Sequence, residues 1–236
     1  MMTLLSLGFI LGMRHALEAD HAAAVASLAV RNDSMSHTLK QGLAWGVGHT
    51  LTLLTFSSVV LLLGSVIPAR FAQGLEFGVG LMLIGLGLDV IRRLRQERVH
   101  VHIHQHDDRQ PHVHAHSHQG ESRPTAPSYD HPHLHLHGFP FRALLVGLMH
   151  GMAGSAALIL LTLHATITPG QAVGYILVFG LGSTLGMGVL SLVMAIPLWY
   201  SAHSLTRIHR GLQTCVGIGT TVLGLAVIYR NTGWLL

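Results

Sequence analysis

Residues 2–30 read MTLLSLGFILGMRHALEADHAAAVASLAV. The stretch is apolar over the length that a helix needs to cross about 30 Å of hydrocarbon, which takes about 20 residues. Near its centre it holds five ionisable residues, Arg14, His15, Glu18, Asp20 and His21. Each ionisable group costs at least ~2.5 kcal/mol in hydrocarbon, so a cluster of them inside a span indicates function. The stretch therefore predicts both a membrane helix and the position of its chemistry.

The whole chain has the composition of a membrane protein. Of its 236 residues, 50% are hydrophobic and only 10% are charged, whereas an ordinary soluble domain has about 25% charged residues. Residues 92–142 hold 12 of the 24 charged residues, which leaves 12 for the other 185 positions. The single cysteine, Cys215, excludes a disulfide framework. We expect an integral membrane protein with a lipid bilayer as partner, and no nucleic acid, because the arginines cluster at segment ends.

Six apolar stretches are long enough to cross a bilayer, which predicts an all-α fold with six transmembrane helices. They cover residues 2–30, 41–67, 71–91, 143–165, 171–199 and 211–229. No basic region precedes the first stretch, so we expect it to be a span and not a cleaved signal peptide.

Basic residues between the spans predict their orientation, because Lys and Arg beside membrane helices tend to stay cytoplasmic. Eleven of them fall on one side of a six-span chain, and only Arg70 and Arg230 fall on the other. We therefore expect a multi-pass protein of a bacterial inner (plasma) membrane, with both termini outside and residues 92–142 in the cytoplasm.

The two halves of the chain resemble each other at offsets of 134 to 139 residues. The matches pair Gly12, His15, Asp20 and Ala22 with Gly147, His150, Ser155 and Ala157; Gly46, Gly48, Thr50 and Leu51 with Gly180, Gly182, Thr184 and Leu185; and Gly78, Gly80, Gly85 and Leu86 with Gly217, Gly219, Gly224 and Leu225. A unit of three helices crosses the membrane an odd number of times, so its second copy is inverted. We expect two inverted three-helix repeats, residues 1–91 and 143–236, joined by residues 92–142. Many transporters share this plan and bind substrate near the midplane.

The ionisable cluster of the first span allows two functional arrangements. On a regular helix, at 100° per residue, His15, Glu18 and His21 share one arc and Asp20 points elsewhere. Alternatively the helix unwinds so that His15, Asp20 and His21 converge, as in the discontinuous helices of transporter ion sites. A purely structural network of Arg14, Glu18 and Asp20 is a third interpretation, but it leaves two imidazoles unexplained.

Two histidines of other spans are further candidate ligands. His49 lies in a Gly48-His49-Thr50 sequence and is expected at a depth similar to that of His21, and its neighbouring glycine lets an ion approach closely. His150 is the repeat counterpart of His15, but no carboxylate follows it, so the roles of ligand and gate both stay open. His164, near the outer end of its span, is interpreted as an interfacial residue.

The candidate metal ligands are thus His15, Asp20, His21, His49 and His150. Imidazoles with one carboxylate suit borderline divalent ions such as Ni, Co, Zn and Cu. Mg and Ca are disfavoured because their sites are built from oxygen ligands.

Residues 92–142 carry three tracts of alternating histidine, at 100–106, 112–118 and 131–137, with 12 of the 20 histidines of the chain. Alternate residues of an extended chain project to the same side, so each tract would offer several imidazoles to a metal. The Pro, Ser and Gln content predicts a largely disordered segment, suited to buffering, capture or sensing. Because imidazolium does not bind metal, we expect its affinity to fall as the pH drops through ~6.5.

The sequence RHALEADH at residues 14–21 resembles the His-x4-Asp-His signature of the nickel/cobalt transporter family, and Gly48-His49-Thr50 resembles that family's Gly-His-Ser/Thr motif. The resemblance implies that four residues take part in metal binding and passage, namely His15, Asp20, His21 and His49. An acidic motif of the longer members is replaced by HGMAGSAA at residues 150–157. This stretch resembles the short six-helix branch described as urease-accessory or membrane nickel-transport proteins.

Together these features predict a membrane transporter of divalent Ni or Co, with uptake as the leading hypothesis. The nearest alternative is efflux of Ni, Co or Zn, with the histidine tracts collecting excess metal. Another is a membrane metallochaperone that supplies a cytoplasmic nickel enzyme or its accessory protein. A di-iron membrane oxygenase is disfavoured, because it needs several closely spaced histidine pairs at one membrane face. We expect no enzymatic activity and no resident cofactor, since the metal ion is the cargo.

Overall fold

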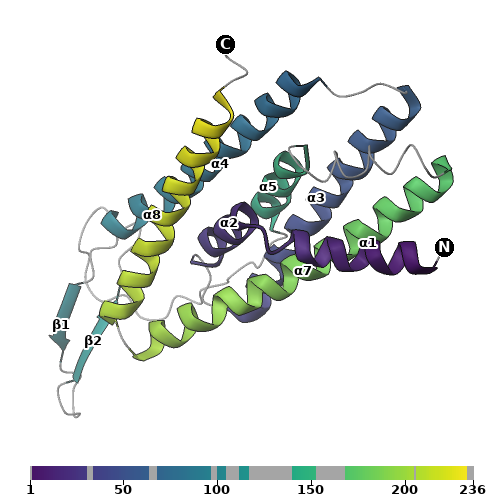
Figure 1. Ribbon diagram of the computed structural model, residues 1–236. Helices are drawn as coiled ribbons and strands as arrows, with labels where there is room; N and C mark the ends of the chain where they lie inside the picture. Colours follow the sequence, from purple (N-terminus) through teal and green to yellow (C-terminus); the bar gives the residue numbers. More distant parts are fainter. Residues whose placement is uncertain are drawn as a thin grey trace.

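The structure, a computed structural model, describes residues 2–30, 34–63, 68–96, 100–104, 112–116, 140–152, 168–204 and 206–232. Within these ranges the chain is helical apart from one short hairpin (Figure 1). The helices are α1 (Met2–His15), α2 (Ala19–Ala29), α3 (Met35–Leu63), α4 (Ala69–Gln96), α5 (Phe141–Met152), α7 (Pro169–Ser204) and α8 (Thr206–Arg230).

Among the described residues, three helices are long and apolar enough to cross a membrane, judged by length and composition. They cover residues 69–96, 170–201 and 208–230, with mean hydropathies of 1.8, 2.0 and 1.7. Large apolar side chains on their outer faces are more than half exposed, among them Leu81, Leu88, Val222 and Leu225. An extended apolar exterior of this kind fits a lipid environment. The count of six spans stays a prediction, because residues 153–167 lie outside the described ranges.

The first predicted span forms two helices, α1 and α2, rather than one. Between them the backbone N–H groups of Leu17 and Glu18 donate to the carbonyl oxygens of Arg14 and His15, each at 3.0 Å. Glu18 is extended, with φ −61° and ψ 149°. The local sequence does not require this break, because Ala, Leu and Glu favour helix. The break therefore arises from tertiary packing, and the unwound arrangement is the one that the structure adopts.

Close helix packing at glycines surrounds the break. Helix α7 packs against both α1 and α3, and α3 also packs against α5. A Cβ atom at Gly12 would overlap the carbonyl oxygen of Phe179, and one at Gly147 would overlap that of Trp45. Because glycine has no side chain at these two positions, the backbone of α1 contacts the backbone of α7, and that of α5 contacts that of α3.

Helices α4 and α8 form an antiparallel pair. Gly80 lies against Gly224, and Gly87 lies against Gly217. By contrast, a Cβ atom at Gly85 would have nothing within 4 Å. The N-terminal end of α4 is therefore next to the C-terminal end of α8, on the side of the pair that lies away from the hairpin (Figure 1).

The hairpin occupies part of the histidine-rich segment. Strands β1 (His100–His104) and β2 (His112–His116) pair antiparallel, and their register places His100, His102 and His104 opposite His116, His114 and His112. The third histidine tract, residues 131–137, lies outside the described residues. Helix α4 continues to Gln96 and α5 begins at Phe141, so both extend a few residues into the segment 92–142.

One ion-pair network links α4 to the start of α5. The Asp89 carboxylate accepts a hydrogen bond from Arg142 at 2.9 Å and one from Arg93 at 3.3 Å. Exposed pairs of this kind contribute about 0–1 kcal/mol, so this network positions the helix ends more than it stabilises them.

Two glycines of α4 that are two residues apart give a matched test of this packing. A Cβ atom at Gly87 would lie 2.6 Å from the carbonyl oxygen of Gly217. We expect Gly87→Ala to lower the free energy of unfolding by about 1–3 kcal/mol, measured by thermal unfolding of the purified protein in detergent. Gly85→Ala, which faces open space, should be neutral or slightly stabilising. Equal effects of the two variants would contradict the α4–α8 contact.

Candidate metal centre

The structure brings all five predicted site residues to one place. His15 ends α1, Asp20 and His21 lie in the first turn of α2, His49 is the central residue of α3, and His150 lies near the end of α5. The break between α1 and α2 makes this possible, because it turns the end of α1 and the start of α2 toward α3 and α5. Ligands that are distant in sequence thus meet inside the helical bundle.

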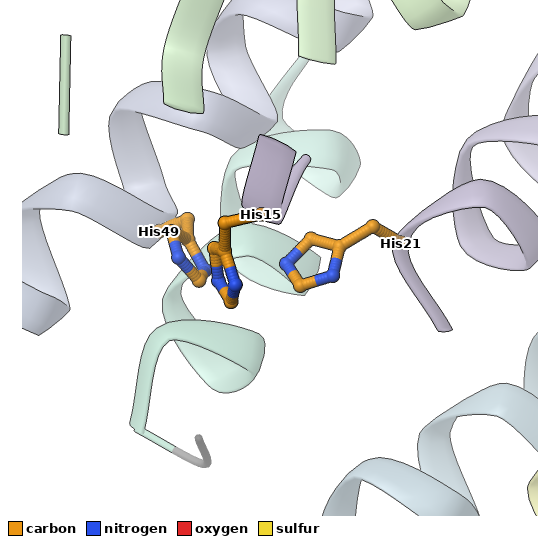
Figure 2. A group of neighbouring side chains, drawn as sticks. All are labelled: His15, His21 and His49. Atoms are coloured by element: carbon orange, nitrogen blue, oxygen red, sulfur yellow. The ribbon is translucent and has the colours of Figure 1, made fainter. Parts of the chain in front are cut away.

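The first group of potential ligands is His15, His21 and His49. Figure 2 shows the three rings turned toward one another. One nitrogen from each ring can be chosen so that the three atoms all lie within 4.8 Å of one another. The ring centroids of His15 and His21 are 4.5 Å apart, and each lies 5.3 Å from that of His49. Nitrogens bound to one ion at about 2.1 Å can be at most about 4.2 Å apart, so small ring rotations would close this group around a metal.

A second group, Asp20, His21 and His150, shares one histidine with the first. Its ligand atoms also lie within 4.8 Å of one another. Nε2 of His150 lies 3.1 Å from one oxygen of Asp20, and Nδ1 of His21 lies 3.0 Å from the other. The ring centroids of His21 and His150 are 4.2 Å apart. His21 therefore stands between two overlapping ligand sets.

Carboxylates orient two of the imidazoles. An ionised carboxylate only accepts hydrogen bonds, so Nδ1–H of His15 donates to Glu18 at 3.0 Å, and Nδ1–H of His21 donates to Asp20. In both rings the proton then sits on Nδ1, and the Nε2 lone pair is available to a metal. Histidine ligands of protein metal sites are commonly held by this kind of outer carboxylate.

Asp20 is also fixed by the start of helix α2. Its side chain accepts the backbone N–H of His21 at 2.9 Å. The N-terminus of a helix carries a partial positive charge that favours a carboxylate. The break therefore supplies backbone groups that stabilise the one acidic residue among the predicted ligands.

The histidines are deeply buried but incompletely hydrogen-bonded. His21, His49 and His150 are each 1% exposed, and His15 is 7% exposed. Within the described ranges, Nε2 of His15, Nε2 of His21 and both nitrogens of His49 have no hydrogen-bond partner. Buried polar atoms are normally paired, and leaving one unpaired costs about 1–3 kcal/mol. A ligand that accepts several nitrogen lone pairs at once would remove this cost, which is what a borderline divalent cation does.

Two aromatic residues, which the sequence analysis did not identify, pack against the histidine rings of the centre. Trp45 stacks on the ring of His21 with centroids 5.6 Å apart, and Phe179 lies 5.4 Å from that of His15. Trp45 is one helical turn before His49, so the spacing of four residues on one face was a usable signal. No local signal identifies Phe179, because it comes from α7.

Some of the residues in the sequence patterns lie elsewhere. Arg14 is exposed beside the break rather than paired inside the cluster. Ser155, Ala157 and His164 lie outside the described residues. Glu18, assigned above to a shared helix face or to a structural network, instead holds the ring of His15.

Comparison with known proteins finds a relative that matches nearly the full length of the chain. A scan against models of known protein families finds no match, and no solved structure matches the chain. The urease accessory protein UreH of Bacillus sp. (strain TB-90) is 33% identical over 231 residues, which are 98% of this chain and 92% of that protein. The chain therefore belongs to the family of the urease accessory protein UreH.

Proposed function

We propose that this chain is a membrane transporter that carries Ni(II), or Co(II), into the cytoplasm through the centre formed by the five predicted ligands. The observation that carries the proposal is the convergence of unpaired imidazole nitrogens at a break in a helical bundle. Such groups are costly in a membrane and mark ion pathways. Kinship with a urease accessory protein supports a role related to nickel.

The two overlapping ligand groups support movement of the ion rather than storage. An ion held by His15, His21 and His49 can pass to Asp20 and His150 while it keeps His21 as a ligand. His150 comes from α5 in the second half of the chain, whereas the other ligands come from the first half. A displacement of the two halves relative to each other would therefore change which group is complete.

The helix contacts support two related halves. Gly46 of α3 lies against Thr184 of α7, and the equivalent Gly180 of α7 lies against Thr50 of α3. The pair α1–α7 has a counterpart in α5–α3, with the halves exchanged. Exchange of this kind is what an inverted repeat produces, and transporters of that design bind substrate between the repeats.

The membrane potential favours the uptake direction. An inward-negative potential of 100 mV contributes about 2.3 kcal/mol per charge, so a divalent cation gains about 5 kcal/mol on entering the cell. This gain supports uptake against a concentration ratio of about 10³, whereas efflux has to overcome it. The distribution of basic residues predicts that the histidine tracts lie on the cytoplasmic side, where they would bind the arriving ion. The register of the hairpin, with histidine opposite histidine at three positions, supports this role.

A second candidate is a membrane metallochaperone that holds nickel on the histidine tracts and does not transport it. The relative's description as a urease accessory protein favours this candidate. In that case the tracts, and not the buried centre, would carry the function.

Removal of one ligand tests the transport proposal. We expect cells that express the wild type to accumulate Ni or Co, and His49→Ala to bring the content to the level of cells without the protein, a loss of at least about tenfold. His49 has no other hydrogen bond to lose within the described part of the chain. The measurement is total cellular Ni, Co, Zn and Mn by mass spectrometry, normalised to protein in the membrane.

His209→Ala is the matched control, because His209 bonds Ser201 and Gln213, away from the centre. It should leave accumulation unchanged. Metal content lowered by the wild type in a His49-dependent way would establish efflux instead. No dependence on His49 for any of the four metals would sink the transport proposal.

Deletion of residues 99–137 separates transport from chaperoning. A transporter should keep an initial rate of radioactive Ni uptake within about twofold of the wild type, because the buried centre stays intact, and should lose retention of metal at low supply. A chaperone should lose its entire effect. Uptake that disappears on this deletion, with the protein still present in the membrane, would favour the second candidate.

A further inference from the structure

A cavity of about 420 Å³ leads to the metal centre from the ends of α4 and α8 that lie away from the hairpin (Figure 1). Its polar lining residues include His15, Glu18, Asp20, His21, Glu76 and Arg230. Val79, Leu223 and Val227 supply apolar walls. The cavity thus joins one end of the helical bundle to the ligands at the helix break.

Two of the predicted ligand residues line the buried end of the cavity. His15 and His21 line it, both are more than nine-tenths buried, and their Nε2 atoms have no hydrogen-bond partner among the described residues. These are the same nitrogens that Glu18 and Asp20 leave free by holding Nδ1. An ion in this cavity would therefore lie beside two imidazoles whose Nε2 atoms have no other partner among the described residues.

The outer part of the cavity differs in chemistry from the centre. Glu18 is 47% exposed and its side chain contributes carboxylate oxygens, and Glu76 is half-buried on α4. Carboxylate oxygens suit a hydrated cation, because a cation bound by one or two carboxylates can keep several of its water molecules. About six waters at ~30 Å³ each occupy roughly 180 Å³, so a hydrated ion fits a cavity of about 420 Å³.

We propose that Glu18 and Glu76 form a loading site for a hydrated divalent cation, ahead of the imidazole centre, and that Arg230 opposes it from the same cavity. The inference rests on the proposed transport function and adds a step before it. The two carboxylates concentrate the ion while it is hydrated, and the imidazoles replace its waters afterwards. Arg230 carries the opposite charge and weakens this attraction.

Glu76 gives the cleanest test, because Glu18 also orients His15. We would measure initial Ni(II) uptake against external Ni(II) in cells that express the full chain, at low ionic strength. Glu76→Gln should raise the half-saturating concentration about fivefold, which corresponds to about 1 kcal/mol, with a maximal rate within about twofold of the wild type. Glu76→Asp, which keeps the charge, should restore most of the affinity.

Charge of the opposite sign should have the opposite effect. Arg230→Gln should lower the half-saturating concentration. Asp89→Asn removes a negative charge from the other end of α4, outside the cavity, and should leave it unchanged. Added salt should raise the half-saturating concentration of the wild type more than that of Glu76→Gln, because it screens the carboxylate.

Three results would overturn the loading site. They are an unchanged half-saturating concentration in Glu76→Gln, a shift of Arg230→Gln in the same direction as Glu76→Gln, and a loss of maximal rate alone. The parallel variant His49→Ala separates this failure from failure of the transport proposal. If His49→Ala abolishes uptake and Glu76→Gln changes nothing, only the loading site is wrong. If His49→Ala transports normally, the transport function itself is wrong.

Discussion

The hydrogen bonds that Asp20 accepts from His21 and His150 are the contacts on which the rest of the structure depends. The first lies within the opening turn of α2, and the second ties α2 to α5 in the other half of the chain. Inside an apolar bundle a lone carboxylate is strongly disfavoured, and Asp20, which is 28% exposed, has these imidazoles and the start of helix α2 around it. The break between α1 and α2 provides that helix start. A straight helix would have neither the backbone donor at His21 nor the convergence of His15 and His21.

Under the proposed function, the same contacts would orient the side chains of the centre for a metal. Glu18 and Asp20 hold Nδ1 of two rings, and the aromatic walls hold the ring planes. Preorganisation of this kind spares an incoming ion the cost of reorienting its ligands. The predicted ligands nevertheless come from both halves of the chain. A movement of one half relative to the other would therefore separate them, although each ring is held by its own neighbours. That combination suits a protein that binds an ion and then releases it on the other side.

Sequence reasoning located the cluster but could not choose its geometry. Apolar length located α3, α4, α7 and α8, although α3 begins at Met35, earlier than the predicted span at residue 41. The break was undecidable from local propensity, because Ala16, Leu17 and Glu18 all favour helix. The position of Phe179 beside His15 could not be predicted from the sequence, because it depends on the tertiary packing of α7. The cavity could not be predicted either, because it depends on the antiparallel pairing of α4 and α8, which brings Arg230 and Glu76 to the same cavity. The roles of the five predicted residues as metal ligands stay predictions.

Coordination of nickel in the purified protein tests the central claim most directly. X-ray absorption of Ni(II) bound to the chain lacking residues 99–137 would count imidazole ligands without a contribution from the histidine tracts. We predict about one bound ion with about three imidazoles, and the loss of one imidazole in His49→Ala. An imidazole count that does not change in His49→Ala, or nickel binding that disappears with the histidine tracts, would contradict a metal centre at the helix break.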